Sequence, residues 1–412
     1  MSTSPMPIFR DIPPTAGFPL HARDIAAGFL SLRSPDLLAA DVKQYLGIPY
    51  TRTTCSGTAA LYFICCALHS LTPRRTIITP SFICPLVPLA VHRAGFRVVV
   101  ADINERDFHY APRILAEVCA ASGDIAAIVA NHLGGIPIDL AALRSVARQH
   151  ECFIIEDCAQ ALGALSQGCR VGTLGDFAFF SFAAGKGMTM YEGGMMATRH
   201  AAYAPLLDAA ATRHAHSAVG IEARRILELF GYWLFYRPSL FWFVFTMPQK
   251  LWLLRGNDIS AFRENFDAAF PLHAVSRFRI GVARTGFAHL ESRIAQQRDK
   301  AAWYIRALET CPAIHIVLEM PGDRATYPYV TVVFDDPAAR DRALRHSSRL
   351  GAGVSQIYAR AIGDYPYLRG IVSAGPCDNA RLMARRSLTL STSAFLTKKD
   401  AAAVTDAIKK AL

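Results

Sequence analysis

Between about residues 58 and 200, short apolar runs with β character alternate with helical patterns. We expect strands at Thr76–Thr79, Arg97–Ala101, Ala126–Ala130, Cys152–Glu156 and Phe177–Phe182, with helices at 58–70, 84–94, 112–121 and 139–150. Near-continuous hydrophobic strands separated by helices are typical of a mainly parallel sheet covered on both faces. In such sheets ligands bind beyond the carboxyl ends of the strands. We therefore expect functional residues directly after the strands.

The chain length indicates more than one domain. It has 412 residues, 52% of them hydrophobic and 19% charged, whereas one domain commonly holds about 100 to 200. We predict a large α/β domain over residues 25–270 and a smaller C-terminal α+β domain over 271–412, with a long helix at about 278–309. The smaller domain shows β-type runs at 313–318 and 328–334, a helix at 337–349, and a last helix whose capping box would be Thr397 with Asp400.

Charge and cysteine usage narrow the functional classes. The formal net charge of +11 would attract anions, although it could equally be a solubility charge spread over the surface. No basic stripe with interleaved aromatics predicts nucleic-acid binding. The ten cysteines form no CxxC pair and no zinc spacing, so we expect no metal site and a reducing, cytoplasmic location. The start, MSTSPMPIFRDIPP, does not have the pattern of a secretory signal.

Residues 226–254 are unusually apolar, reading ILELFGYWLFYRPSLFWFVFTMPQKLWLL. Charged residues and prolines interrupt them, so no stretch of about 18 uncharged apolar residues remains and a membrane-spanning helix is not expected. We predict two short apolar helices broken at Pro238. Their exposed faces could form a domain or subunit interface. The alternative is a peripheral contact with a membrane surface.

Two ionisable residues follow consecutive strands. Asp157 directly follows the run CFIIE, and Gln160 comes three residues later. A buried carboxylate at the end of a strand needs a cationic or hydrogen-bonding partner such as a protonated pyridine nitrogen. Lys186 follows Ser181 in a loop rich in Gly, Ala and Met. It is placed to bind phosphate or to act as an amine nucleophile of lowered pKa. Together, Asp157 and Lys186 suit a bound group that acts as an electron sink and is held at both of its ends.

An anion-binding helix start precedes these residues. Gly57 and Thr58 lie in the run SGTAAL, where small residues expose backbone N–H groups at a helix N-terminus. Each motif is common alone, but the order of anion cradle, Asp, Ser, Lys and Gly-Gly is much rarer. His132, in NHLGG, could lie near a cofactor or be a hydrogen-bonded structural residue. We expect Glu192 with the following glycines to shape the turn after Lys186.

The motifs SGTAAL, TPSF, ADIN, NHLGG, IEDCAQALGA, VGTLGDFAFFSF and EGGM together resemble the DegT/StrS-type sugar aminotransferases. The resemblance extends from about residue 25 to 410. It implies a fold-type I pyridoxal-phosphate-dependent transferase, in which the large domain binds the cofactor. The same resemblance implies a homodimer with its active sites at the subunit interface.

The resemblance also implies roles for individual residues. Lys186 would form the Schiff base with pyridoxal 5'-phosphate and transfer protons. Asp157 would pair with the pyridine nitrogen, and Gln160 would hydrogen-bond the phenolic oxygen. The phosphate would be held by Gly57, Thr58 and Ser181.

Two positions differ from the family pattern. Cys84 occupies the position where many members stack an aromatic ring on the cofactor, so we expect either a sulfur contact there or a substitute such as Phe82. Where many members extend an asparagine into the neighbouring subunit, this chain reads AVSRF, and Ser276 or Arg277 is the candidate replacement.

The expected reaction transfers an amino group from an amino acid, glutamate, to a keto-sugar carried on a nucleotide, with ping-pong kinetics. A dehydratase on the same fold ranks lower, because such relatives replace the Schiff-base lysine with histidine. Two alternatives stay open. One is a membrane-surface-associated enzyme with a lipid-linked or otherwise hydrophobic acceptor, and the other is a non-catalytic binding or regulatory protein that kept the fold.

Overall fold

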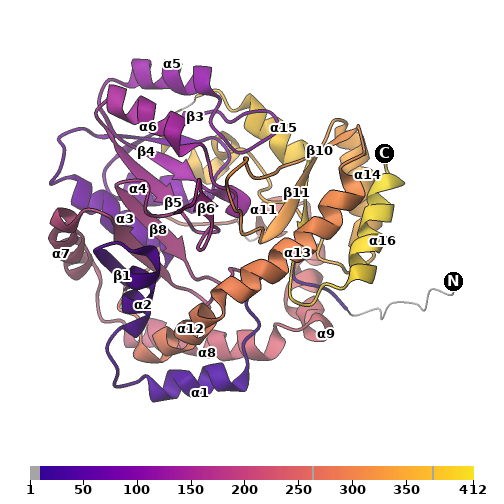
Figure 1. The fold of residues 1–412 in the computed structure, drawn as a ribbon, viewed down its shortest axis with the longest axis horizontal. Coiled ribbons are helices and arrows are strands. Elements are labelled where there is room, and N and C mark those ends of the chain that lie inside the picture. The colour runs from indigo at the N-terminus through magenta and orange to yellow at the C-terminus, as the bar shows by residue number, and fades with distance from the viewer. Residues whose placement is uncertain (1–9, 262–263, 374) are drawn as a thin grey trace.

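An eight-stranded sheet forms the centre of the protein (Figure 1). The computed structural model describes residues 10–261, 264–373 and 375–412. The strand order is β1-β9-β8-β5-β4-β2-β3-β12. All neighbours from β8 to β12 are parallel, while β9 is antiparallel to both β1 and β8. The predicted mainly parallel α/β sheet is confirmed. The strands are β1 (Tyr50–Thr54), β2 (Thr76–Pro80), β3 (Arg97–Ala101), β4 (Ile125–Asn131), β5 (Phe153–Asp157), β8 (Phe177–Ser181), β9 (Gly194–Thr198) and β12 (Val372–Ser373).

Helices cover both faces of this sheet. Successive side chains of a strand point to opposite faces, so Ile77 packs in the core that includes α3 whereas Ile78 packs in the core that includes α5 and α6. Both faces are apolar, which explains the near-continuous hydrophobic strands. The helices are α1 (Ala22–Leu30), α2 (Leu37–Leu46), α3 (Gly57–Leu68), α4 (Leu86–Arg93), α5 (Pro112–Ser122), α6 (Leu140–Gln149) and α7 (Ala204–His214).

A second, three-stranded antiparallel sheet forms in the C-terminal part, in the order β10-β11-β13. The strands and helices of the C-terminal part are β10 (Ile314–Ile316), β11 (Tyr329–Phe334), α14 (Pro337–Ser348), α15 (Asp378–Arg386), β13 (Ser387–Ser391) and α16 (Lys398–Lys409). The capping box of Thr397 with Asp400 at the start of α16 is confirmed. The domain boundary at residues 270 and 271 stays a prediction, and β12 from the C-terminal part joins the large sheet.

The single long helix expected at 278–309 is wrong. The segment forms two helices, α12 (Arg277–Ala288) and α13 (Leu290–Leu308), the latter running diagonally toward α16 in Figure 1. His289 separates them, and its N–H bonds to the carbonyl of Gly286, three residues back, at 3.1 Å. This tighter turn ends the regular α-helical ladder, which uses bonds four residues back.

The predicted break of the apolar segment at Pro238 is confirmed. Helix α8 (Val219–Phe235) ends before it, and α9 (Pro238–Phe241) begins with it. A π-helical turn at Trp242–Thr246 leads to α10 (Met247–Leu254) and then α11 (Asp258–Ala261). Within the described ranges, no helix has both the length and the apolar character needed to cross a bilayer. Residues 1–9, on which part of the secretory-signal expectation rests, lie outside the described residues.

Candidate active site

The predicted anion cradle is built from closely packed backbone. Ser56 caps α3, and its Oγ accepts the N–H of Ala59 at 3.0 Å. A Cβ added to Gly57 would lie 3.1 Å from the Cβ of Ser181, so these two predicted residues are neighbours. A Cβ added to Gly194 would lie only 2.4 Å from the nitrogen of Gly57. Glycine at these positions therefore lets β9 approach the start of α3, where the N–H groups of the first turn can bind an anion.

Asp157 ends β5 at the carboxyl edge of the sheet and is only 5% exposed. Its Oδ1 accepts the N–H of Ala159 at 3.0 Å, and no other described residue donates to this carboxylate. Burial raises the pKa of Asp157 to about 6, opposed by the Ala159 N–H and by the positive charge of Lys186. The carboxylate is therefore poised for a cationic partner.

Lys186 lies in the loop that joins β8 to its antiparallel neighbour β9. Its amine makes no hydrogen bond to any residue that the structure describes. Burial lowers the pKa of Lys186, and the negative charge of Asp157 opposes this shift. The ionisation of Lys186 is therefore coupled to that of Asp157. A lowered pKa increases the neutral fraction of the amine, which is its nucleophilic form.

Gln160 has a fixed orientation. Its Oε1 accepts the N–H of Gly134 at 2.9 Å and the hydroxyl of Tyr329 at 2.6 Å. Since a backbone N–H only donates, Oε1 must be the oxygen, and the amide NH₂ remains available as a donor. Gln160, Ser181 and Lys186 line one small cavity. The structure therefore brings the predicted residues together, while their individual roles stay predictions.

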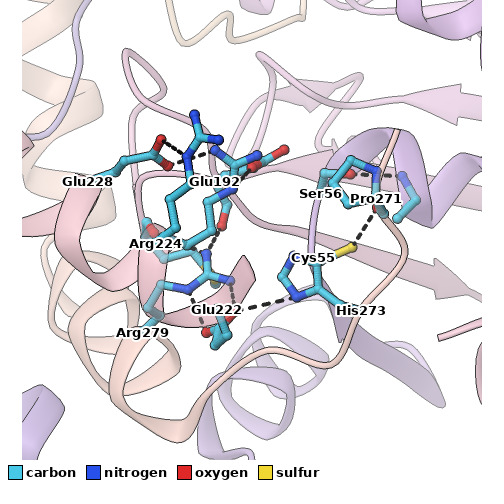
Figure 2. A network of polar contacts seen from close by, with 12 residues as sticks. Cys55, Ser56, Glu192, Glu222, Arg224, Glu228, Pro271, His273 and Arg279 are labelled. Carbon is cyan, nitrogen blue, oxygen red and sulfur yellow. Dashed lines mark hydrogen bonds and ion pairs between the residues drawn. The ribbon is translucent and has the colours of Figure 1, made fainter. Parts of the chain in front are cut away.

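A buried network of charges supports the loop that carries Lys186 (Figure 2). Arg279 is fully buried and donates twice to Glu222, at 2.7 Å from Nε and 2.6 Å from Nη2. Its Nη1 donates to the backbone carbonyl of Glu192, whose side chain forms an ion pair with Arg225. Glu192 thus anchors the turn after Lys186, as the sequence suggested. Helix α12 therefore fixes the far end of this loop through Nη1 of Arg279, and the bidentate pair with Glu222 holds the guanidinium in place.

His132 is a hydrogen-bonded structural residue. Its Nδ1 accepts the N–H of Ile138 at 3.1 Å, which leaves the proton on Nε2 to be donated to Glu156 at 3.1 Å. Burial would raise the pKa of Glu156, but His132 and backbone N–H groups outweigh it and leave the pKa lowered. Cys158 lies close enough for a three-residue metal cluster. Hydrogen bonds already account for the histidine and the carboxylate, so we propose no metal there.

Two aromatic residues contribute to this site in ways that the sequence does not show. Tyr329 belongs to the small sheet, and nothing local to it signals contact with Gln160. Tyr358 packs edge-on against Phe82, with ring centroids 5.2 Å apart. Burial raises the pKa of Tyr358, and the negative charge of Asp157 adds to this shift.

The three remaining sequence candidates have other environments. Phe82 is 1% exposed and stacks on Phe108. Ser276 caps α12, its Oγ accepting the N–H of Arg279 at 3.3 Å, and Arg277 is exposed.

Comparison with protein families gives one decisive match. The model of the DegT/DnrJ/EryC1/StrS aminotransferase family matches residues 33–227 and 276–409. The chain belongs to this family. The resemblance, the fold class and the expectation of an aminotransferase are thereby confirmed. Residues 228–275 lie between the matched ranges.

Relatives of the chain include a nucleotide-sugar aminotransferase. It is 26% identical to the UDP-N-acetyl-3-dehydro-α-D-glucosamine 3-aminotransferase of Acidithiobacillus ferrooxidans, over 94% of this chain and 90% of the relative. It is 34% identical to Protein MosB of Rhizobium meliloti, but that match spans 38% of this chain and only 31% of the relative.

Solved structures show the same fold. DesI, solved with its TDP-sugar product, superimposes with a TM-score of 0.73 at 20% identity, covering 98% of this chain and 93% of DesI. The PLP form of the sugar aminotransferase Spr1654 from Streptococcus pneumoniae gives a TM-score of 0.73 at 17% identity, covering 98% of this chain and 100% of that one.

Proposed function

We propose that this enzyme uses pyridoxal 5'-phosphate to move an amino group from glutamate to a keto-sugar. The observation that carries the proposal is the pairing of Asp157 with Lys186. One is a buried carboxylate with a raised pKa and the other is an amine with a lowered pKa, and neither has a side-chain hydrogen-bond partner in the described part of the chain. The names of the relatives support a sugar substrate, and the PLP form of Spr1654 supports the cofactor.

The residues present fit this cofactor at three points. The α3 N-terminus, with Gly57, Thr58 and neighbouring Ser181, suits a phosphate. Asp157 suits a protonated ring nitrogen, which would relieve the cost of burying a lone carboxylate. The NH₂ group of Gln160, held by its bonded Oε1, suits a phenolic oxygen. Cys84 lies beside Lys186 as a neutral thiol, since burial raises its pKa to about 11.

Each side chain would then have one task. When bound, pyridoxal phosphate supplies an electron sink for the substrate carbon that carries nitrogen. Asp157 keeps the ring nitrogen charged through the Coulomb attraction of a buried site. Lys186 would hold the cofactor through Nζ, and as a free amine it would take and return the proton at the substrate carbon. Gln160 and the α3 N-terminus fix the orientation of the ring.

The assembly and the location are part of the same proposal. We infer a homodimer, as the family resemblance implies, and a cytoplasmic enzyme. The ten cysteines are all free in the structure, which is consistent with a reducing compartment.

The test is an absorbance spectrum of the cofactor-loaded protein before and after adding glutamate. We expect the visible band of the lysine-bound cofactor to disappear as the amino form accumulates. Lys186→Ala should lack that band, whereas Lys399→Ala, an exposed lysine on α16, should behave like the wild type. A band that persists in Lys186→Ala, or that does not respond to glutamate or any other amino acid in the wild type, would contradict the proposal.

A further inference from the structure

A cavity of about 630 Å³ lies next to the proposed active site. One side of its wall is aromatic, with Tyr232 and Phe235 on α8, Tyr236 after it, and Phe241 and Phe245 beyond Pro238. Another part of the wall is the N-terminal segment at Pro13 and Thr15. All of these residues lie outside the ranges matched by the family model. The aromatic side of the cavity therefore comes from segments that the family model does not match.

The cavity reaches the catalytic residues. Gln160, Tyr329 and Gly185 line its inner end, and Gly185 directly precedes Lys186. The hydroxyl of Thr15 donates to the carbonyl of Gly185 at 2.7 Å, so the N-terminal segment joins this loop to the cavity wall. A molecule whose reacting carbon lies near Lys186 can extend directly into this space.

The aromatic side of the wall presents carbon to the cavity, whereas Glu228, Ser355, Gln356 and Thr389 add polar groups elsewhere in the lining. The hydroxyl of Tyr232 donates to the carbonyl of Phe18 at 2.8 Å, and that of Tyr236 reaches the carbonyl of Thr15 at 3.5 Å. The Tyr236 ring stacks on Tyr232 and meets Phe241 edge-on. With their polar ends bonded to backbone, these rings offer apolar faces to a ligand.

The outer end of the cavity continues into an exposed apolar surface. Phe235 and Val244 line the cavity and are 38% and 37% exposed. The neighbouring exposed side chains are also large and apolar, and include Phe243, Met247, Leu251 and Trp252. Residues 234–255 contain three cations, Arg237, Lys250 and Arg255, and no Asp or Glu. An apolar surface with only positive charges suits an amphiphile whose polar part is anionic.

We propose that the amino acceptor is a keto-sugar joined through phosphate to an apolar chain. The chain lies in the aromatic cavity and leaves it between Phe235 and Val244. This inference rests on the proposed aminotransferase function and adds the class of acceptor. Burial of the chain would supply binding energy remote from the reacting carbon, which transferases use to position substrates.

Binding of n-alkyl phosphates from butyl to decyl, each below its micelle concentration, tests the inference in calorimetry with the cofactor-loaded protein. We expect the affinity to rise about threefold to fourfold per methylene until the chain fills the cavity. Gly231→Leu adds a side chain to the cavity wall, where a Cβ meets no atom within 4 Å. It should weaken decyl phosphate at least tenfold and butyl phosphate little.

Gly220→Leu is the matched control, since Gly220 lies on the same helix, is equally unobstructed and does not line the cavity. Affinities independent of chain length, or equal losses in both variants, would overturn the inference. The inference would also be overturned if light scattering showed that Gly231→Leu dissociates a dimer while the affinity did not depend on chain length. That result would assign the surface to a subunit contact.

The response to glutamate needs no acceptor and is measured on the same protein. A spectrum that responds to glutamate, without any chain-length effect, removes this inference alone. A chain-length effect in a protein that does not respond to amino donors removes the proposed function instead.

Discussion

The carboxyl group of Asp157 is held in the protein at a cost to stability. Burial raises its pKa to about 6, from an ordinary value of 3.8. A carboxyl with a raised folded-state pKa favours folding only when protonated, so its contribution is full below about pH 4 and is lost as the pH rises through about 6. This rise in the pKa corresponds to a destabilisation of about 3 kcal/mol when the carboxyl group is ionised. Functional sites commonly keep such a destabilising group for a ligand to neutralise.

Asp157→Asn should therefore stabilise the cofactor-free protein at pH 7.5 while impairing catalysis. We expect its Tm to exceed that of the wild type at pH 7.5, with the difference shrinking toward pH 4, because both proteins then carry a neutral side chain. Thermal unfolding of the cofactor-free proteins at the two pH values measures this. A lower Tm for the variant at pH 7.5, or a difference that does not depend on pH, would contradict the account.

At this scale the sequence identified residues that follow strands and missed those that arrive from elsewhere. Asp157 and Lys186 could be predicted because a charge directly after a buried strand needs a reason. Tyr329 could not, since it reaches Gln160 from another sheet, 169 residues along the chain. The edge-on contact of Tyr358 with Phe82 likewise joins residues far apart in the chain.

Helix α12 holds the catalytic loop through one side chain. Arg279 joins Glu222 of α8 to the backbone after Lys186, entirely out of solvent. Removing one partner of a buried pair leaves the other charge uncompensated, which costs about 3–5 kcal/mol. Held in place by Glu222, Arg279 also sets the position of the loop relative to α12.

Arg279→Ala should lower the free energy of unfolding by about that amount, about 3–5 kcal/mol, and should weaken cofactor retention. Arg284→Ala is the control on the same helix, because Arg284 forms an exposed pair with Asp41 at 2.6 Å. We expect that change to cost less than about 1 kcal/mol. Urea unfolding of both variants measures the difference, and similar losses in the two would refute the assigned role.

Strands of the central sheet could be predicted where nearly every residue in a short run is apolar. The five expected strands correspond to β2, β3, β4, β5 and β8 within one or two residues at either end. Strands β1, β9 and β12 gave no such signal, because β1 is only partly buried, β12 has two residues, and β9 follows the glycine-rich loop. The break between α12 and α13 has no proline to mark it, so periodicity alone joined the two helices.

For the whole molecule, the alternation of strands and helices was enough to predict the fold class. The arrangement of the segment after residue 227 was not, since nothing in its composition shows which face turns inward. The structure packs Leu229 and Tyr232 against Phe278 and Val282 of α12 and directs other aromatic rings to the cavity. The sequence suggested an interface role for this apolar stretch. In the structure it also lines the cavity beside Lys186.

The central claim is that the amine of Lys186 bonds to the cofactor. Borohydride reduction of the cofactor-loaded protein followed by peptide mass mapping tests it most directly. The account predicts one reduced pyridoxal phosphate label per chain, on the peptide that contains Lys186. A label on a different lysine, or no label on a protein that retains the cofactor, would contradict it.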